Sequence, residues 1–220
     1  MMKVDLHVHT SYSDGDAIDK ILCYARKRRL DAIAITDHDT TEAVAKAENN
    51  KHHILIIPGI ELETELGHIL VLGARQPPPP TKAHNYHQLL DWAAEENAVT
   101  VLAHPVATPT TLTHLKEIAS HKPAAVETHN ALYPAYPLAT WLSSKIAAKL
   151  RAPRTGGSDS HTAETVGLTY TLINADKTVE EILEAIRKGL TTPQGRPAPI
   201  TQRIKAATFL AKPPNKAGRQ

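Results

Sequence analysis

The chain has 220 residues, of which 41% are hydrophobic and only 4% aromatic, and its formal net charge is +2. This length predicts one domain with its own core, and the small net charge gives no indication of a nucleic-acid or membrane partner. The single cysteine, Cys23, excludes an internal disulfide and fits a reducing compartment. No apolar run approaches the ~20 residues of a membrane-spanning helix, and the sequence starts without a basic and then apolar leader. We therefore expect a cytoplasmic protein with no membrane partner and no obligate protein partner.

Short apolar runs alternate with helix-like segments along the chain. The apolar runs predict strands at Lys3–Leu6, Ala32–Thr36, Ile54–Pro58, Ile69–Gly73, Val99–Ala103, Ala124–Thr128 and Pro153–Gly156. The segments between them predict helices at Asp16–Arg29, Thr40–Asn50, Tyr86–Asn97, Thr110–His121 and Pro134–Leu150. This alternation predicts an α/β fold with a mainly parallel sheet or barrel. A regular eight-fold barrel needs ~250 residues, so we expect a smaller or irregular one.

Three segments depart from this alternation. The interval from Ile54–Pro58 to Ile69–Gly73 is too short for a helix and predicts an antiparallel hairpin. The four prolines at 77–80 predict a stiff polyproline II loop. Residues 201–220 contain five Lys or Arg and no acid, which favours a flexible basic tail over a basic arm for a polyanion. The expected organisation is a domain of residues 1–200 followed by this tail.

Residue types that bind metals follow most of the predicted strands. His7 and His9 are two residues apart, so on a strand both rings point to the same face. The others are Asp14, Asp37, His38, Glu61, His68, His104, Asp159 and His161. Because parallel strands in a closed sheet end at one rim, these side chains would converge and repel one another unless cations held them together. One such histidine alone is more often an ordinary core or surface residue, but the whole set indicates a metal site.

The chemistry of these side chains narrows the choice of metal. Mixed imidazole and carboxylate ligands suit Zn, Mn or Fe better than Ca or Mg. The absence of cysteine ligands argues against a structural zinc site. Clustered divalent ions lower the pKa of a bridging water and neutralise charge on phosphoryl oxygens. We therefore expect hydrolysis of a phosphate ester by attack of a metal-bridging hydroxide.

Five motifs give the chain a family resemblance. They read Asp5-Leu6-His7-Val8-His9-Thr10-Ser11-Tyr12-Ser13-Asp14-Gly15, Ile35-Thr36-Asp37-His38, Gly59-Ile60-Glu61, Leu102-Ala103-His104-Pro105 and Gly157-Ser158-Asp159-Ser160-His161. In this order the chain resembles the PHP family, the polymerase and histidinol phosphatase superfamily of metal-dependent phosphoesterases, over residues 3–190. The resemblance implies a distorted, TIM-like (β/α)7 barrel with two or three divalent ions (Mn, Zn or Fe) at the C-terminal rim of its strands.

The resemblance also implies a division of the ligands among three metals. The three groups would be His7, His9, Glu61 and Asp159; Asp14, His38 and His161; and His68 and His104, with Glu61 bridging the first and third. His68 is fixed least by the resemblance, because the histidine of this stretch moves among family members.

Four further residues have expected roles near this centre. Asp37 either orients a metal-bound histidine or caps the following helix. Arg154 and Arg196 are the best-placed arginines for bidentate contact with phosphate, and a structural or surface role for each stays open. His129 follows a strand where many relatives carry an aromatic residue that is not a ligand, so we expect it to line the substrate pocket.

Within the family, the chain is most similar to short stand-alone phosphoesterases. These act as 5′–3′ exonucleases on short 5′-phosphorylated oligonucleotides or as nucleotide phosphatases, so the expected partner is a small phosphorylated substrate or a short oligonucleotide. A histidinol-phosphate phosphatase is the alternative substrate class. A non-catalytic, accessory metal-binding protein is the alternative of a different kind.

Overall fold

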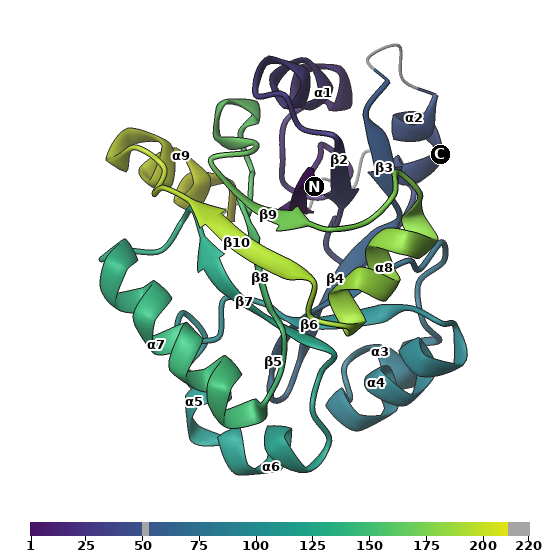
Figure 1. Ribbon diagram of the computed structural model, residues 1–220, viewed down its shortest axis with the longest axis vertical. Coiled ribbons are helices and arrows are strands. Elements are labelled where there is room, and N and C mark those ends of the chain that lie inside the picture. Colours follow the sequence, from purple (N-terminus) through teal and green to yellow (C-terminus); the bar gives the residue numbers. More distant parts are fainter. Residues whose placement is uncertain (50–52, 211–220) are drawn as a thin grey trace.

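The computed structural model describes residues 1–49 and 53–210, which fold into strands at the centre with helices around them (Figure 1). The strands of this part of the chain are β1 (Met2–Val8), β2 (Ala32–Ile35), β3 (Leu55–Ile57), β4 (Gly59–Thr64), β5 (Gly67–Leu72), β6 (Val99–Leu102), β7 (Ala125–Asn130), β8 (Arg154–Gly157), β9 (Thr169–Ile173) and β10 (Thr191–Gly195). The helices are α1 (Ile18–Lys27), α2 (Ala43–Glu48), α3 (Pro80–Ala83), α4 (Tyr86–Glu95), α5 (Pro109–Thr113), α6 (Leu115–Ser120), α7 (Tyr136–Leu150), α8 (Val179–Arg187), α9 (Ile200–Leu210) and the 3₁₀ turn η1 (Ala163–Thr165).

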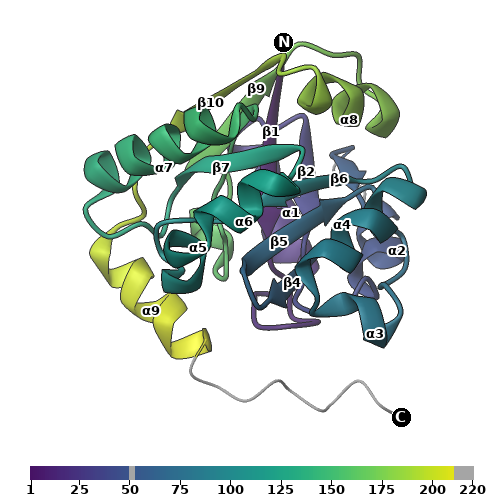
Figure 2. The ribbon, with the colours of Figure 1, turned by 90° about the horizontal axis from the view of Figure 1, so that it is seen from below.

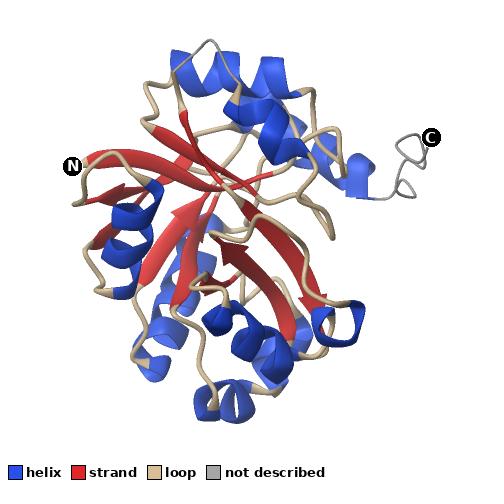
Figure 3. Cartoon of the chain, turned by 90° about the vertical axis from the view of Figure 1, so that its right-hand side faces the viewer, coloured by secondary structure: helices blue, strands red, loops and turns tan. Residues whose placement is uncertain are grey.

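The strands form two five-stranded sheets. Their orders are β10-β9-β1-β2-β3 and β4-β5-β6-β7-β8. Strands β1, β2 and β3 run parallel, as do β6, β7 and β8, while the hairpin β4–β5 and strands β9 and β10 add antiparallel pairs. Figure 3 shows the strands crossing in the interior with helices on the outside. The predicted mixed α/β class is confirmed.

The two sheets touch where their strands end. Val8, at the end of β1, bridges Ser160 just after β8, and His9 N donates to Ser160 O at 3.0 Å. On the other side His38, just after β2, bridges Glu61 of β4, and Glu61 N donates to Asp37 O at 3.2 Å. These two junctions bring the motif residues of both sheets to one place.

The predicted hairpin is present but shifted along the chain. Its strands are β4 and β5, whereas β3 pairs in parallel with β2. Pro58 lies between β3 and β4, and because proline has no N–H to continue a ladder, the chain leaves one sheet there and enters the other. The prediction that Ile54–Pro58 forms the first hairpin strand is therefore wrong.

Helical predictions hold for most segments, with differences at specific residues. The segment predicted as one helix at Thr110–His121 is two, α5 and α6, with His114 between them. Helix α2 is shorter than expected, and Asn50 at the end of that prediction lies outside the described residues. Pro80 begins α3, where a proline at the first position costs no hydrogen bond. Pro79 has φ −53° and ψ 140°, in the polyproline II region.

Several elements between residue 158 and the end of the described chain were not expected. Strand β9 alternates buried and half-buried residues and β10 is mostly exposed, so neither has the continuous apolar run used to find the others. Helix α9 occupies residues 200–210 of the segment expected to be a flexible tail, and residues 211–220 lie outside the described part. No helix in the described residues is long and apolar enough to span a bilayer.

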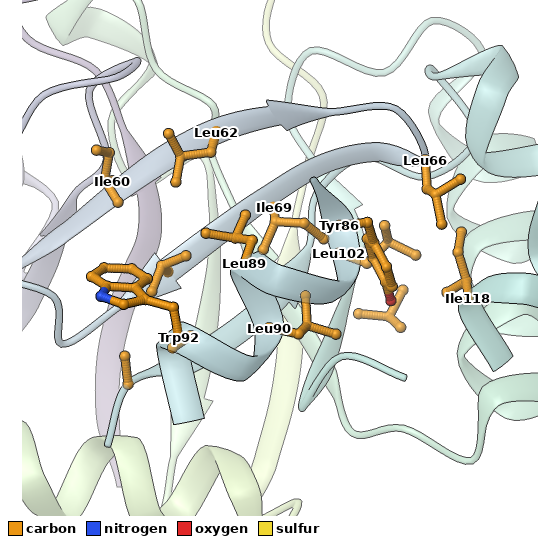
Figure 4. Packing of buried hydrophobic residues seen from close by; sticks show 14 of the residues in the cluster. Ile60, Leu62, Leu66, Ile69, Tyr86, Leu89, Leu90, Trp92, Leu102 and Ile118 are labelled. Carbon is orange, nitrogen blue, oxygen red and sulfur yellow. The ribbon is translucent and has the colours of Figure 1, made fainter. Parts of the chain in front are cut away.

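The largest packed cluster lies between α4 and the strands β4, β5 and β6. Figure 4 shows Leu89 and Trp92 of α4 against Ile60, Leu62 and Ile69 of the strands, with the other members of the cluster around them. Helix α4 starts cleanly because the side chain of its N-cap residue Asn85 accepts a hydrogen bond from Gln88 N at 3.0 Å. This packing fixes the β4–β5 hairpin, which carries two of the predicted metal ligands.

Truncating one side chain of this cluster tests how much the cluster contributes to the stability of the fold. Ile69 has no exposed surface, so Ile69→Ala should lower the free energy of unfolding by about 2–5 kcal/mol through lost burial and the cavity left behind. Ile204→Ala is the matched control, because Ile204 is 61% exposed, and it should change stability by no more than about 0.5 kcal/mol. Urea denaturation of both variants measures the difference, and equal effects would contradict this account of the core.

Candidate metal centre

The structure brings all nine predicted ligands together at the junctions of the two sheets. His7 lies in β1, Glu61 in β4 and His68 in β5, while the rest follow a strand: His9, Asp14, His38, His104, Asp159 and His161. His7, His9 and Glu61 have no exposed surface. Three overlapping sets of these side chains have ligand atoms within 4.8 Å of one another.

The first group has the dimensions of a tetrahedral metal site. His7 Nε2, His9 Nε2 and Glu61 Oε2 lie 3.1 Å from one another. Asp159 Oδ1 lies 3.5 Å from His7 Nε2 and 3.4 Å from His9 Nε2. Four ligands at the usual zinc distances are about 3.4 Å apart. The separations therefore fit one ion at the centre of these four atoms.

The hydrogen bond on the far side of His7 supports this reading. His7 Nδ1 lies 3.0 Å from Glu127 Oε1, so it donates its proton there and directs Nε2 toward the group. A buried carboxylate behind a ligand histidine is the usual arrangement at metal sites. Either a proton or a metal ion must therefore lie between Nε2 and the carboxylate oxygens that it faces.

The second group surrounds Asp14. His161 Nε2 lies 3.1 Å and His38 Nε2 3.8 Å from Asp14 Oδ2, and His9 Nδ1 lies 3.6 Å from Asp14 Oδ1. His161 Nδ1 donates to the Asp159 carbonyl at 3.0 Å, so its Nε2 also carries a lone pair. Within the described residues, His161 Nε2 and His9 Nδ1 are buried, and each faces an oxygen of the Asp14 carboxylate. The positions of His161 Nε2, His38 Nε2 and Asp14 Oδ2 fit a second cation.

Glu61 connects the first group to a third. Its Oε2 belongs to the first group, while its Oε1 lies 3.0 Å from His68 Nδ1 and 3.1 Å from His104 Nε2. Each carboxylate oxygen therefore serves a different set of histidines. This is the geometry of a carboxylate that bridges two ions.

Two of these residues have unusual backbone conformations. His104 has φ +26° and Asp159 has φ +53°. Such conformations cost about 1–3 kcal/mol for residues other than glycine and collect at functional sites. His104 is held by its N–H, which donates to Glu127 Oε2 at 2.9 Å.

Opposite charges shift the pKa values of the cluster in opposite directions. Burial alone would raise the pKa of Glu61 and of Asp159, but the surrounding histidines hold both well below their usual range. Burial alone would lower the pKa of His7 and of His9, but Asp159 and Glu61 outweigh it and raise that of His9 to about 10. The pKa of Asp14 falls to about 2, because the close contact with His161 and the charges of the nearby histidines exceed the effect of burial. The centre thus attracts positive charge, for which protons and metal ions compete.

Parts of the chain are similar in sequence to known proteins. A family model described as PHP-associated matches residues 137–191. The 5′-3′ exoribonuclease Rnm of Escherichia coli is 42% identical over 65 residues, which are 27% of this chain and 22% of that protein. The phosphoribosyl 1,2-cyclic phosphate 1,2-diphosphodiesterase of Eggerthella lenta is 35% identical over 88 residues, 36% of this chain and 34% of that protein. The matches therefore span about a third or less of these relatives.

A crystal structure extends the similarity over most of the fold. It is a two-domain protein from Bacteroides vulgatus that contains a predicted PHP-like metal-dependent phosphoesterase, with a TM-score of 0.72 and 19% identity. The similarity covers 89% of this chain and 65% of that one. The chain is therefore similar to PHP proteins in the segment that the family model matches and in its fold. The nine side chains that the sequence motifs predict as ligands lie together in this fold.

A cavity of about 280 Å³ opens beside the candidate metal centre. One wall consists of ligand side chains, among them His38, His68 and His161, and the opposite wall of Ala107, Thr108, Asn130, Leu132, Tyr133 and Pro134. The two walls differ in chemistry: one offers charge and imidazole, the other mostly apolar surface. This arrangement suits a small molecule whose charged end faces the centre.

Sequence reasoning missed Glu127 and Asn130 of β7. Asn130 Nδ2 donates to Glu127 Oε2 at 2.9 Å and to Asp159 Oδ2 at 3.1 Å. The pairing of β7 with β8 shifts register between Glu127 and His129, and such a bulge re-aims the following side chains. Asn130 therefore points to the centre on the same side as Glu127. A buried acid in the Val126-Glu127-Thr128 run was the available signal.

The substrate-binding predictions are not supported by the geometry. Because of the bulge, His129 does not line the cavity; it packs against Tyr136 with ring centroids 6.2 Å apart. Arg154 is exposed at the start of β8, and Arg196 lines a different cavity. All three residues are thus outside the cavity beside the centre.

Asp37 has neither of its two expected roles. Its Oδ1 accepts hydrogen bonds from Thr10 N and Ser13 Oγ, both at 2.6 Å, and its Oδ2 accepts one from Thr10 Oγ1 at 2.7 Å. The N-cap of α2 is Glu42 instead. Asp37 therefore fixes the loop that carries Asp14, and Glu127 is the carboxylate that orients a ligand histidine.

Replacing Glu127 tests that orienting role. In Glu127→Gln the amide oxygen accepts the hydrogen bonds from His104 N and Asn130 Nδ2. The NH₂ group then faces His7 Nδ1, which must accept a hydrogen bond from it. The proton of the His7 ring therefore moves to Nε2, the atom expected to bind the metal. Metal affinity should fall about 10- to 100-fold, measured by competition with a chelator. Glu63→Gln, an exposed position on the same strand as Glu61, is the control. Unchanged affinity in Glu127→Gln would show that His7 is not a ligand through Nε2.

Metal uptake should release protons. The pKa of His9 is raised from 6.5 to about 10 in the metal-free fold, so the proton stabilises that fold fully below pH 6.5, and this contribution is lost as the pH rises through about 10. At pH 8 a metal must displace this proton to use the imidazole. Calorimetric titration in two buffers of different ionisation enthalpy should show the release of at least one proton per chain. Metal affinity should also increase from pH 7 to pH 9; a flat profile without proton release would contradict the protonated cluster.

Proposed function

We propose that this chain is a metal-dependent phosphoesterase that hydrolyses phosphate esters of nucleotides or short 5′-phosphorylated oligonucleotides. The observation that carries the proposal is the position of Glu61, whose two oxygens each lie about 3 Å from a different set of histidine nitrogens. A bridging carboxylate of this kind implies neighbouring cations, which suit phosphoryl transfer better than a single structural ion.

The residues present fit two or three divalent ions such as Mn, Zn or Fe. The first group would hold one ion through His7, His9, Glu61 and Asp159, and the second through Asp14, His38 and His161. His68 and His104 with Glu61 would hold the third. When bound, such ions supply Lewis acidity and lower the pKa of a coordinated water. The protein's own residues set the positions of the ions and exclude bulk water from the buried side.

The cavity beside the centre supports a small substrate. Its imidazole wall would face the phosphate, and Asn130, whose amide donates to Asp159 Oδ2 at 3.1 Å, also lines the cavity. Leu132, Tyr133 and Pro134 offer an apolar surface for a sugar or a base. The relatives named above agree with phosphoester chemistry, because an exoribonuclease and a cyclic phosphate diphosphodiesterase both cleave phosphodiester bonds.

The finer fold prediction belongs to the same proposal. A distorted (β/α)7 barrel would place all ligand-bearing strand ends on one rim. The bridges Val8–Ser160 and His38–Glu61 support it, since they join the two sheets at both sides of the centre.

A substrate panel tests the proposed activity. p-Nitrophenyl phosphate, a nucleoside 3′,5′-bisphosphate, histidinol phosphate and 5′-phosphorylated oligonucleotides would be assayed with Mn, Zn and Fe. We expect the highest kcat/KM for the nucleotide substrates. A higher kcat/KM for histidinol phosphate would contradict the proposed nucleotide substrates and would indicate a histidinol-phosphate phosphatase. Full metal content with no turnover of any substrate would favour the accessory metal-binding role.

Ligand variants connect activity to the centre. His7→Ala and Asp159→Asn should lose metal and at least about 100-fold in kcat/KM, because each removes a ligand of the first group. His84→Ala is the control, since His84 is exposed and outside the cluster. Retention of full metal content by both ligand variants would refute the assignment.

A further inference from the structure

Two histidines outside the metal centre face each other between α4 and α6. His87 lies in the first turn of α4, and His121 directly follows α6. Their Nδ1 atoms lie 3.3 Å apart, and their ring centroids lie 5.4 Å apart. Figures 1 and 2 show both helices on the outside of the fold. Within the described residues, neither histidine belongs to the sets of side chains gathered at the metal centre.

The outer nitrogen of each ring faces a carboxylate of the other helix. His87 Nε2 lies 3.3 Å from Glu117 Oε1 of α6, and His121 Nε2 lies 3.3 Å from Asp91 Oδ1 of α4. On each helix the histidine and the acid are four residues apart, a spacing that places both on one helix face. Two matching faces, each with one imidazole and one carboxylate, therefore meet.

These carboxylates determine where the ring protons lie. A carboxylate only accepts hydrogen bonds, so each one favours a proton on the Nε2 atom that faces it. A neutral imidazole has one N–H and one lone pair, so the Nδ1 atoms of His87 and His121 both carry lone pairs. Two lone pairs that face each other at 3.3 Å repel unless a proton or a metal ion lies between them. A carboxylate behind the ring is also usual for a metal-binding histidine.

The separation of the two Nδ1 atoms fits a single ion. Two nitrogens at the usual distance from a tetrahedral zinc ion are about 3.3–3.4 Å apart. Imidazole ligands suit Zn, Ni or Cu, whereas Mn and Mg prefer oxygen ligands. The side chains of His87 and His121 are 38% and 37% exposed. An ion can therefore reach the pair from solvent, and water can complete its coordination.

Buried contacts hold the two histidines in position. Tyr86, next to His87, has no exposed surface, and its hydroxyl donates to the His121 carbonyl at 2.9 Å. Tyr86 and Ile118 of α6 belong to one packed cluster (Figure 4). The start of α4 and the end of α6 are thus fixed relative to each other, so an ion would meet the two imidazoles already in place.

We propose that His87 and His121 form a separate metal site, which binds one ion of the class that prefers imidazole (Zn, Ni or Cu) and links the end of α6 to the start of α4. The site does not depend on the proposed phosphoesterase activity. Helix α4 packs against the β4–β5 hairpin, which carries Glu61 and His68. The ion would therefore stabilise the fold around the metal centre without contacting the substrate.

Counting bound zinc tests the site. Equilibrium dialysis against Zn followed by elemental analysis should give one more ion per chain for the unchanged protein than for His87→Gln or His121→Gln. His114→Gln is the matched control, because His114 is exposed at the start of α6 and contacts Thr110 and Thr113; it should bind as much Zn as the unchanged protein. Dialysis against Mn should give equal contents for all four proteins. Equal Zn contents throughout, or an equal loss in His114→Gln, overturns the proposal.

Stability and turnover separate this site from the metal centre. Zn should raise the urea midpoint of unfolding more in the unchanged protein than in His87→Gln or His121→Gln, because an ion that binds only the folded chain stabilises it. An equal rise in all three overturns the proposal. Both variants should leave kcat/KM for phosphate esters unchanged, and a fall that accompanies the loss of Zn overturns the site as a separate one. If no protein hydrolyses any phosphate ester, the proposed function fails, whereas a lost Zn equivalent in the two variants still supports this site.

Discussion

A wholly buried carboxylate, Glu61, is the constraint on which the rest of the structure depends. Removing a carboxylate from water is costly unless charges and hydrogen bonds compensate it. Here four histidine nitrogens lie 3.0–3.1 Å from its two oxygens. Its backbone N–H also forms the junction between the two sheets. The strand ends must therefore meet around this one side chain.

Other carboxylates that are not ligands keep this meeting point rigid. Asp5 accepts hydrogen bonds from Ser158 N, Ser158 Oγ and Gly167 N, at 2.6–2.8 Å. Burial raises the pKa of Asp5 to about 6 despite these bonds. Gly157 allows the close contact between β8 and β1, because a Cβ there would collide with the Cβ of His7. The Asp5 hydrogen bonds and the close packing at Gly157 thus fix the position of β1 against β8, and the Asp37 hydrogen bonds fix the loop that carries Asp14.

The sequence predicted which side chains would lie together at the centre, because those residues occur in short motifs with fixed spacing. The strand ends could be found from apolar runs, since strands buried on both faces have little polar content. The missed parts depended on long-range geometry. No local sequence pattern marks the bulge that turns Asn130 toward the centre and His129 away from it. Strand β9 alternates buried and half-buried residues, so its sequence lacks the continuous apolar run by which the other strands were found.

The ring of His9 lies between two groups: its Nε2 faces Glu61 and Asp159, and its Nδ1 faces Asp14. A neutral imidazole has one lone pair and one N–H, so His9 can coordinate on one side only and must present a proton to the other. Filling the first group fixes that tautomer and turns His9 into a hydrogen-bond donor toward Asp14. The two positions are therefore coupled through one imidazole ring, so an ion bound in the first group changes the affinity of the second group for its ion.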